Sequence, residues 1–303
     1  MTRPELEPRL SLLDARVAVS VSESSDLARL GLGPQHCDAA VAEVVRGVLL
    51  AGGRVLYGGR LKPPGFTQIM MKEADSYAAP ARSLTLYVPY PEWASIPRTE
   101  LDELGRGLRE SVELMLLDRD GATIELDAAC EFPLVEKTAM PGALTAMRER
   151  IAADATAAVL IGGKLERRAP SISKNLEVES ARDPLSEYWV PGVIEEARTM
   201  LDRRVPLFCA GGFGGAAAAV AKTLAGRELP WAPPNFPAGV ASDPAAKELR
   251  SLRQSRPGPV KNGLTSDEQQ RLESSHRPGE IAALVVLGLS RIHEPGARGH
   301  ATR

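Results

Sequence analysis

The sequence has few of the residues on which a disulfide scaffold, a zinc site or a nucleic-acid surface depends. Its 303 residues include three cysteines and four histidines, and neither type is clustered. A disulfide framework or a zinc site needs closely spaced Cys or His side chains, so we expect neither, and no other metal. Aromatic residues make up only 4%, and the formal net charge is −2. Both values argue against a nucleic-acid partner, because base stacking needs aromatic rings and phosphate contacts need excess positive charge.

Long hydrophobic runs are also missing. No segment approaches the roughly 18 apolar residues of a membrane helix, and the first residues are polar, unlike a secretory signal peptide. We therefore expect a cytoplasmic protein without a membrane partner. The composition is that of a globular protein, with 44% hydrophobic and 25% charged residues, enough for one large core or two modest ones.

Short apolar runs alternate with helical patterns through about residue 225. Such alternation is typical of an α/β fold, here a doubly wound, mainly parallel, Rossmann-like sheet with right-handed crossovers. We expect this domain to span residues 1–229. The patterns predict strands at 15–21, 54–57, 83–88, 121–126, 157–161 and 205–210, and helices at 35–50, 66–76, 97–117, 141–153, 192–203 and 216–224.

The character of the chain changes after this domain. Seven prolines lie between Pro230 and Pro259, so this stretch is predicted to be extended or loop-like. Helices are predicted at 266–273 and 278–292, and the second is apolar on most sides. It is therefore expected to be buried against this chain or a second copy. Residues 230–303 would form a Pro-rich and helical extension.

Four of the predicted strands end in turns of glycine or small polar residues. In a parallel sheet the carboxyl ends of the strands share one edge, where ligands bind at the reversal of strand order. Glycine lets the backbone approach a ligand, and successive N–H groups in such turns hold anions. The alternative for any one turn is ordinary packing. The candidate ligand-binding residues are Ser20, Ser22, Glu23 and Ser24; Gly58, Gly59 and Arg60; Gly162, Gly163 and Lys164; and Gly211, Gly212, Phe213, Gly214 and Gly215.

Charged residues near these turns suit an anionic ligand. Arg60 and Lys164 each follow a glycine pair directly and would place a positive charge beside a phosphate. Glu195 and Glu196 lie near the start of a predicted helix that Gly192 opens. One of these acids would bind ribose hydroxyls or assist glycosidic cleavage. The alternative is that acids at this place only stabilise the helix start.

The turns resemble those of the SLOG superfamily. The shared pattern is a strand with a serine-rich turn, a strand ending in Gly-Gly, and a later strand ending in Gly-Gly with a following Gly-x-x-x-Glu, over about residues 15–225. This superfamily joins the DNA-processing Smf/DprA proteins to the lonely-guy phosphoribohydrolases. It also includes nucleotide-sensing domains of TRPM channels and of some bacterial antiphage effectors.

In the phosphoribohydrolases, a Pro-Gly-Gly-x-Gly-Thr-x-x-Glu motif binds phosphate and supplies the catalytic acid. Residues 162–163 match its glycine pair and residues 192–196 match Gly-Thr-x-x-Glu, so the resemblance implies that Glu196 holds the catalytic position. The chain departs from the family in three ways. Residues 164–191 separate the two halves, Val193 replaces the threonine, and no Glu-Met-His-x-Arg-Lys segment carries the partner arginine.

These departures fit the sensor branch better than the hydrolases. The resemblance therefore implies binding of a nucleotide-derived ligand such as ADP-ribose or cyclic ADP-ribose, in stress or antiphage signalling. The alternative is an N-glycosidic hydrolase acting on a nucleoside monophosphate or a NAD-type molecule. A third interpretation is an assembly domain whose C-terminal apolar helix mediates oligomers. We expect a homo-oligomer, a separate effector protein as partner, and no cofactor.

Overall fold

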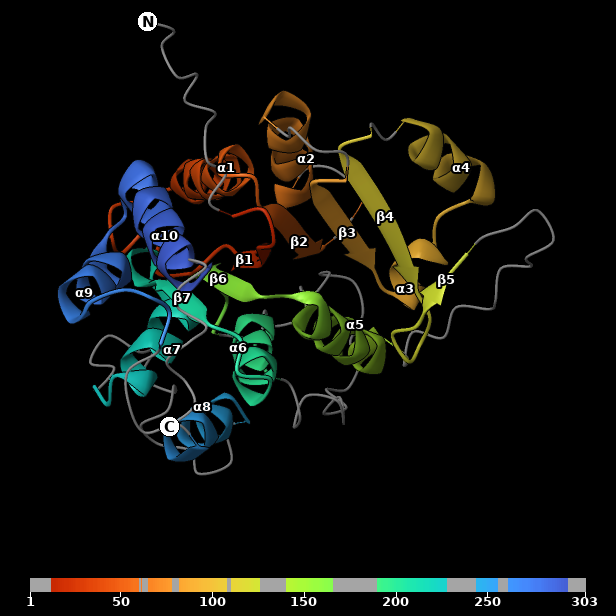
Figure 1. The fold of residues 1–303 in the computed structure, drawn as a ribbon. Coiled ribbons are helices and arrows are strands. Elements are labelled where there is room, and N and C mark those ends of the chain that lie inside the picture. The colour runs from red at the N-terminus through yellow and green to blue at the C-terminus, as the bar shows by residue number, and fades with distance from the viewer. Residues whose placement is uncertain are drawn as a thin grey trace, which may run out of the picture.

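The computed structural model describes residues 12–59, 61, 65–77, 82–107, 110–125, 140–165, 190–227, 244–255 and 261–293. Within them, seven strands form one sheet in the order β5-β4-β3-β2-β1-β6-β7 (Figure 1). Neighbouring strands are parallel except β4 and β5, so the predicted doubly wound, mainly parallel α/β fold is confirmed. The strands are β1 (Arg16–Ser22), β2 (Arg54–Gly58), β3 (Leu84–Val88), β4 (Val112–Leu117), β5 (Thr123–Ile124), β6 (Ala157–Gly162) and β7 (Leu207–Ala210).

Helices cover both faces of the sheet (Figure 1). Helices α1, α2 and α10 lie on one face, and α5, α6, α7 and α8 lie on the other. The helices are α1 (Pro34–Leu50), α2 (Phe66–Tyr77), α3 (Tyr90–Trp93), α4 (Arg98–Gly107), α5 (Met140–Asp154), α6 (Gly192–Asp202), the 3₁₀ helix η3 (Gly211–Phe213), α7 (Gly215–Leu224), α8 (Pro244–Ser255), α9 (Ser266–Ser274) and α10 (Pro278–His293).

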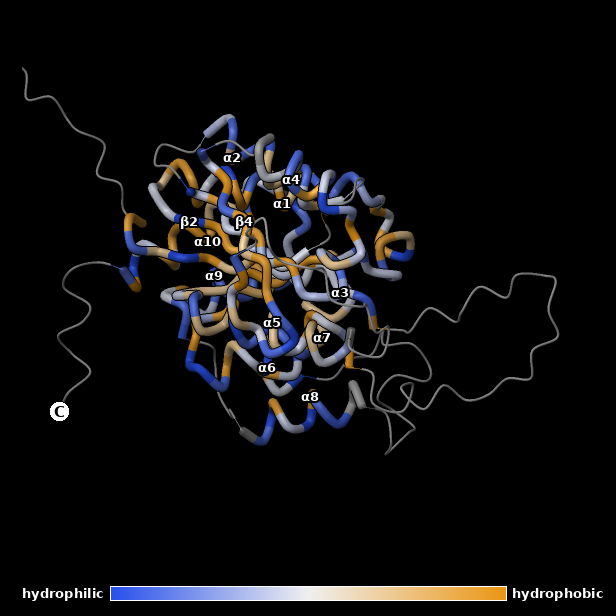
Figure 2. The backbone as a smooth tube through the Cα atoms, turned by 90° about the vertical axis from the view of Figure 1, so that its right-hand side faces the viewer, coloured by the Kyte–Doolittle hydropathy of each residue, from blue (hydrophilic) through white to orange (hydrophobic). Residues whose placement is uncertain are grey.

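Two apolar cores form because successive side chains of a strand point to opposite faces. Val17 and Val19 of β1 pack with the α1 and α10 side, whereas Ala18 packs with the α5 to α7 side. The strand β6, which lies between β1 and β7, is buried at every position, as expected for a parallel strand covered on both faces. Figure 2 shows hydrophobic residues concentrated along the sheet and on the inner sides of the helices.

The C-terminal helix α10 is buried against its own chain. It packs along α1, where Gly47 leaves room for the α10 side chains. A Cβ at Gly47 would lie 3.2 Å from Cγ2 of Val286. Ile281, Val285 and Leu289 of α10 are fully buried in the apolar core that also contains the inner face of α1. The apolar character of α10 is thus explained within one chain and requires no second copy.

Two predicted segments are wrong. The helix predicted at 97–117 ends at Gly107, and residues 112–117 form the parallel strand β4 instead. Leucine and methionine favour helices, but pairing with β3 and burial of Leu116 and Leu117 outweigh that local preference. The stretch predicted as extended contains α8 over 244–255. Its proline stands at the first helical position, where the missing N–H costs nothing.

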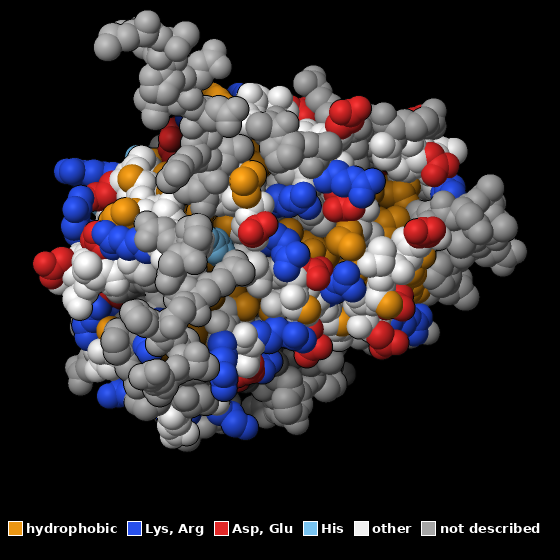
Figure 3. All heavy atoms as spheres, in the orientation of Figure 1, with side chains coloured by type: hydrophobic (Ala, Val, Ile, Leu, Met, Phe, Trp, Pro, Cys, Tyr) orange, Lys and Arg blue, Asp and Glu red, His pale blue; other side chains and the backbone are white. Residues whose placement is uncertain are grey.

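The surface shown in Figure 3 carries acidic and basic side chains interspersed with each other. No helix in the described part of the chain is long and apolar enough to cross a membrane. The boundary predicted near residue 229 stays a prediction. α9 contacts β7 and η3, so the C-terminal part lies directly against the sheet.

Candidate functional site

The order of the strands reverses between β1 and β6, the place where ligands bind in sheets of this kind. Ser22 and Gly162 end these two strands and are paired in register. The Gly163 amide donates to the Ser22 carbonyl at 2.7 Å, and the Lys164 amide donates to Ser22 Oγ at 3.3 Å. The β1 and β6 turns therefore meet at the carboxyl edge of the sheet.

The glycine pair after β6 is required by the backbone and by its neighbours. Gly162 and Gly163 have φ of +62° and +98°, a region that other residues rarely adopt. A Cβ at Gly163 would lie 2.7 Å from Cβ of Ala216 and 2.9 Å from Cγ2 of Val193. Gly163 therefore sits between the starts of α7 and α6, and no larger residue fits there.

The start of α6 has no side-chain cap. The helix begins at Gly192 after Pro191, and no side chain caps it. The Pro191 carbonyl accepts from the amides of Ile194 and Glu195, but no described residue accepts from the amides of Gly192 or Val193. Such N–H groups and the positive end of the helix dipole attract anions.

The start of α7 is closed by the protein itself. The Gly215 amide donates to Asp26 Oδ2 at 2.8 Å, and the Asp26 side chain also pairs with Arg29 at 3.3 Å. A Cβ at Gly214 would lie 2.5 Å from Cβ of Asp26, so the carboxylate is packed tightly on this turn. Ser24 Oγ accepts from the Asp26 amide at 3.1 Å and shapes the same loop. Asp26 thus occupies the position that an anion would take at α7.

The rest of the turn before α7 is filled by packing. A Cβ at Gly211 would lie 2.5 Å from the Glu273 carbonyl oxygen, and one at Gly212 would lie 2.0 Å from the Ser275 carbonyl oxygen. Phe213 is fully buried in the core. Contact with the end of α9 therefore accounts for the small residues here, which was the alternative to ligand contact.

The turn after β2 contacts α5 rather than the other turns. A Cβ at Gly58 would lie 2.8 Å from both Met147 and Ile151 side chains, and Gly59 lies against the ring of Tyr57. The predicted cation Arg60 lies outside the described residues.

An arginine of α5 faces the acids at the start of α6. Nη1 of Arg148 lies 2.5 Å from Oε2 of Glu195, and its Nε lies 3.3 Å from Oε1 of Glu196. Thr145 Oγ1 donates to Oε1 of Glu195 at 2.5 Å. A Cβ at Gly192 would lie 2.7 Å from Nη2 of Arg148, so this glycine makes room for the guanidinium. Both acids at the start of α6 therefore pair with a cation on the helix directly before β6.

Glu196 lies in a buried polar cluster. Burial raises the pKa of its carboxyl, while the charge of Arg148 and the nearby Ser20 hydroxyl oppose the shift. Ser20 is buried, and its Oγ forms no hydrogen bond of good geometry with any described residue. Burial and the charge of Glu196 raise the pKa of Tyr57 to about 12, so β2 also borders this cluster. Glu196 keeps 21% of its side chain exposed, although its carboxyl is largely enclosed by this cluster.

The remaining predicted residues, Lys164 and Glu23, are exposed and lie just after β6 and β1. Lys164 is exposed beside the β6 turn. Glu23 is exposed and lies near Asp38 of α1. Burial is the larger cause of the raised pKa of Asp38, and the charge of Glu23 raises that pKa further. Among the described residues, no group of three or more His, Cys, Asp or Glu side chains is placed to hold a metal ion. Sequence reasoning missed Arg148, Asp26 and Tyr57, because their roles depend on partners far away along the chain.

A doubly wound, mainly parallel sheet whose β1 and β6 turns meet at the strand-order reversal defines a Rossmann-like α/β protein. The family model described as SLOG cluster2 matches residues 11–173 and 187–272, so the chain belongs to this SLOG family. Membership supports nucleotide-related binding or glycosidase-type chemistry. No curated protein and no solved structure matches the chain.

Proposed function

We propose that this protein binds a nucleotide-derived ligand, such as ADP-ribose or cyclic ADP-ribose, at the carboxyl edge of β1, β2 and β6. The observation that carries the proposal is the open start of α6 beside the glycine pair of β6. An uncapped helix start that lies beside a glycine turn, with a lysine directly after the glycines, is suited to bind phosphate. The SLOG membership of the chain agrees with a ligand of this kind.

In this proposal the phosphates lie between the β6 turn and α6. The amides of Gly192 and Val193 would donate to phosphate oxygens, and Lys164 would neutralise charge. The long 3.3 Å bond from the Lys164 amide to Ser22 Oγ would be exchanged for one to the ligand. Gly58 and Gly59 would border the site on the side toward β2.

The ribose would lie over Glu196. The Glu196 carboxylate would accept hydrogen bonds from vicinal hydroxyls of the ribose, and Arg148, with its Nε 3.3 Å from Oε1, would fix its orientation. Ser20 lies beneath this carboxylate and Tyr57 near it. A buried carboxylate held by an arginine is rigid, which favours selective recognition of hydroxyl groups.

Calorimetric titration with ADP-ribose, cyclic ADP-ribose, AMP and NAD tests the proposal. We expect one of these to bind, and Lys164→Ala to weaken that binding about tenfold, the effect of losing one charge-assisted contact. Lys72→Ala removes an exposed lysine on α2 and serves as the control. Absence of binding by all four at millimolar concentration would contradict the proposal.

The second candidate is cleavage of an N-glycosidic bond. It is favoured by the burial of Glu196, which raises the pKa of the carboxyl in the direction that a proton donor requires. Chromatography of nucleoside monophosphates and NAD after incubation would detect a released base. Release that Glu196→Gln abolishes would favour the hydrolase, and intact substrates would favour the sensor.

As a sensor, the protein would act in the cytoplasm, in stress or antiphage signalling. It would form a homo-oligomer and pass the signal to a separate effector protein. Since α10 is buried against α1, a contact between copies would use another surface. The molecular mass in light scattering, measured with and without the ligand, tests the oligomer.

A further inference from the structure

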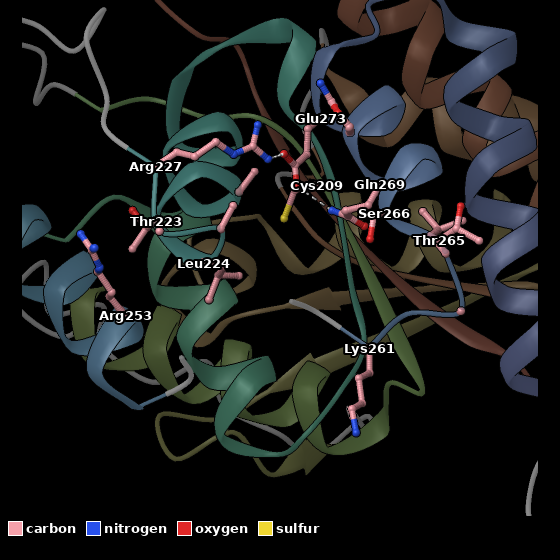
Figure 4. Close-up of a pocket in the computed structure, with 16 residues that line it drawn as sticks. Cys209, Thr223, Leu224, Arg227, Arg253, Lys261, Thr265, Ser266, Gln269 and Glu273 are labelled. Atoms are coloured by element: carbon pink, nitrogen blue, oxygen red, sulfur yellow. Dashed lines mark hydrogen bonds and ion pairs between the residues drawn. The ribbon is translucent and has the colours of Figure 1, made fainter. Parts of the chain in front are cut away.

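A second pocket lies away from the strand-end edge, beside the last strand of the sheet. It has a volume of about 1210 Å³ and opens between α7, α8 and α9 (Figure 4). That volume is sufficient for a drug-sized molecule. It shares no residue with the β1 and β6 turns or with the start of α6. The lining residues are Cys209, Ala221, Thr223, Leu224, Ala225, Gly226, Arg227, Arg253, Lys261, Gly263, Leu264, Thr265, Ser266, Gln269, Gln270 and Glu273.

The centre of the pocket is apolar. Cys209 lies between Leu224 of α7 and Gln269 of α9 (Figure 4). Burial raises the pKa of the Cys209 thiol far above its usual value, so this side chain behaves as an apolar group. Ala221, on α7, is a second small residue in the pocket wall. A flat apolar body would bury itself against this surface.

The charges around the pocket are mostly positive. Arg227, Arg253 and Lys261 come from three separate places, after α7, on α8 and before α9, and they are opposed by one acid, Glu273. Arg227 pairs with Glu273 at one end. No described acid forms an ion pair with Arg253 or Lys261. This local positive excess stands in a protein whose formal net charge is −2.

A lysine next to the pocket is affected by the positive charges on this side. The pKa of Lys222 on α7 is lowered by burial and then by the charges of Arg227 and Arg29, while Glu273 opposes the shift. An anion placed near Arg227 would remove part of this repulsion. The electrostatic field here therefore favours a negatively charged ligand.

We propose that this pocket binds a small organic anion with an apolar body. Figure 4 shows Arg253 and Lys261 on opposite sides of the pocket, with Leu224 and Cys209 between them. The carboxylate or phosphate would be held by Arg253, the body would cover Leu224 and Cys209, and Lys261 would add to the positive field. The exposed Gln270 of α9 would provide a neutral hydrogen-bonding group on the wall formed by α9. Such a site would give the protein a second small-molecule input, separate from the strand-end edge.

Fluorescence titration with 8-anilinonaphthalene-1-sulfonate tests this site, because the dye combines an anionic group with aromatic rings. We expect saturable binding that the double variant Arg253→Ser/Lys261→Ser weakens at least tenfold. Gln270→Trp, which fills the pocket from the exposed face of α9, should weaken it similarly. The control Arg54→Ser/Arg203→Ser removes the same charge from exposed positions elsewhere. Equal losses in both double variants would overturn the proposal, as would unchanged binding in the pocket variants.

Competition separates the two sources of anion. Displacement of the dye by decanoate indicates an acyl carboxylate ligand, and displacement by AMP indicates a phosphate ligand. Failure of both to displace the dye would overturn the proposal. Dye binding should persist in Lys164→Ala, so the result does not depend on the strand-end site. Circular dichroism melts of each variant verify that the fold is retained.

Discussion

Asp26 Oδ2 accepts a hydrogen bond from the Gly215 amide at 2.8 Å, so the start of α7 already holds a negative charge of the chain itself. The start of α6 has no such cap. Both helices begin at the same edge of the sheet, and Gly163 lies against the first turn of each. The proposed anion site is therefore placed at the uncapped start of α6 and not at α7, which the chain caps itself.

Removing the internal cap should cost stability. Asp26→Ala leaves the buried Gly215 amide without its charged acceptor, and we expect a loss of about 1–3 kcal/mol in the free energy of unfolding. Glu23→Ala, an exposed acid of the same loop, should change it by less than about 0.5 kcal/mol. Urea titrations of both variants measure the difference. Equal stability of the two variants would show that Asp26 is not a structural cap.

The glycine after β6 should tolerate no side chain. Gly163→Ala introduces a Cβ into a position with φ of +98° and contacts of 2.7 Å and 2.9 Å, so we expect a loss of about 1–3 kcal/mol. Gly142→Ala in α5 meets nothing within 4 Å and should stabilise the protein by about 0.5–1 kcal/mol. Thermal melts compare the two. A neutral Gly163→Ala would mean that the turn is not tightly packed.

The arginine of α5 should couple to the acids of α6. Arg148→Ala leaves two mostly buried carboxylates without their cation, and we expect a loss of about 3 kcal/mol. Adding Glu195→Ala should recover part of it, because one uncompensated charge is then removed. A double-mutant cycle in urea measures this coupling. Strictly additive effects would contradict the ion pair.

Glu196 and Glu268 should respond to pH with opposite signs. The folded-state pKa of Glu196 is raised from 4.5 by burial, so its contribution to stability is full at low pH and is lost as pH rises through that raised value. The pKa of Glu268 is lowered to about 2 by Arg291 and Thr265, so its contribution is full above 4.5 and is lost as pH falls toward 2.

Unfolding measured at pH 3 and pH 7 tests this pair. Relative to the natural protein, Glu196→Gln should gain stability between pH 3 and pH 7, whereas Glu268→Gln should lose it. The same pH trend in both variants would contradict the assigned environments.

The architecture could be predicted because local patterns and tertiary packing agree over most of the sheet. The continuous apolar run at 157–161 predicts a strand buried on both faces, and β6 is one. Pairing with β3 decides residues 112–117, where the composition alone favours a helix. In the same way α8 follows a run of prolines, and only the first-turn position of Pro244 permits it.

The candidate site was less predictable, because glycine turns have two meanings. Gly163 and Gly212 look alike in the sequence, yet one lies beside an open helix start and the other against the Ser275 carbonyl. Arg148 stands 48 residues before Glu196, so no short motif joins them. Its position on the helix directly before β6 was the available signal.

The most direct test is an amide NMR titration of the protein labelled with ¹⁵N-glycine, using ADP-ribose. The account predicts that the amide resonances of Gly163 and Gly192 shift with saturation, while that of Gly215 stays in place because Asp26 holds it. A shift of Gly215 with Gly163 and Gly192 unmoved would contradict the account.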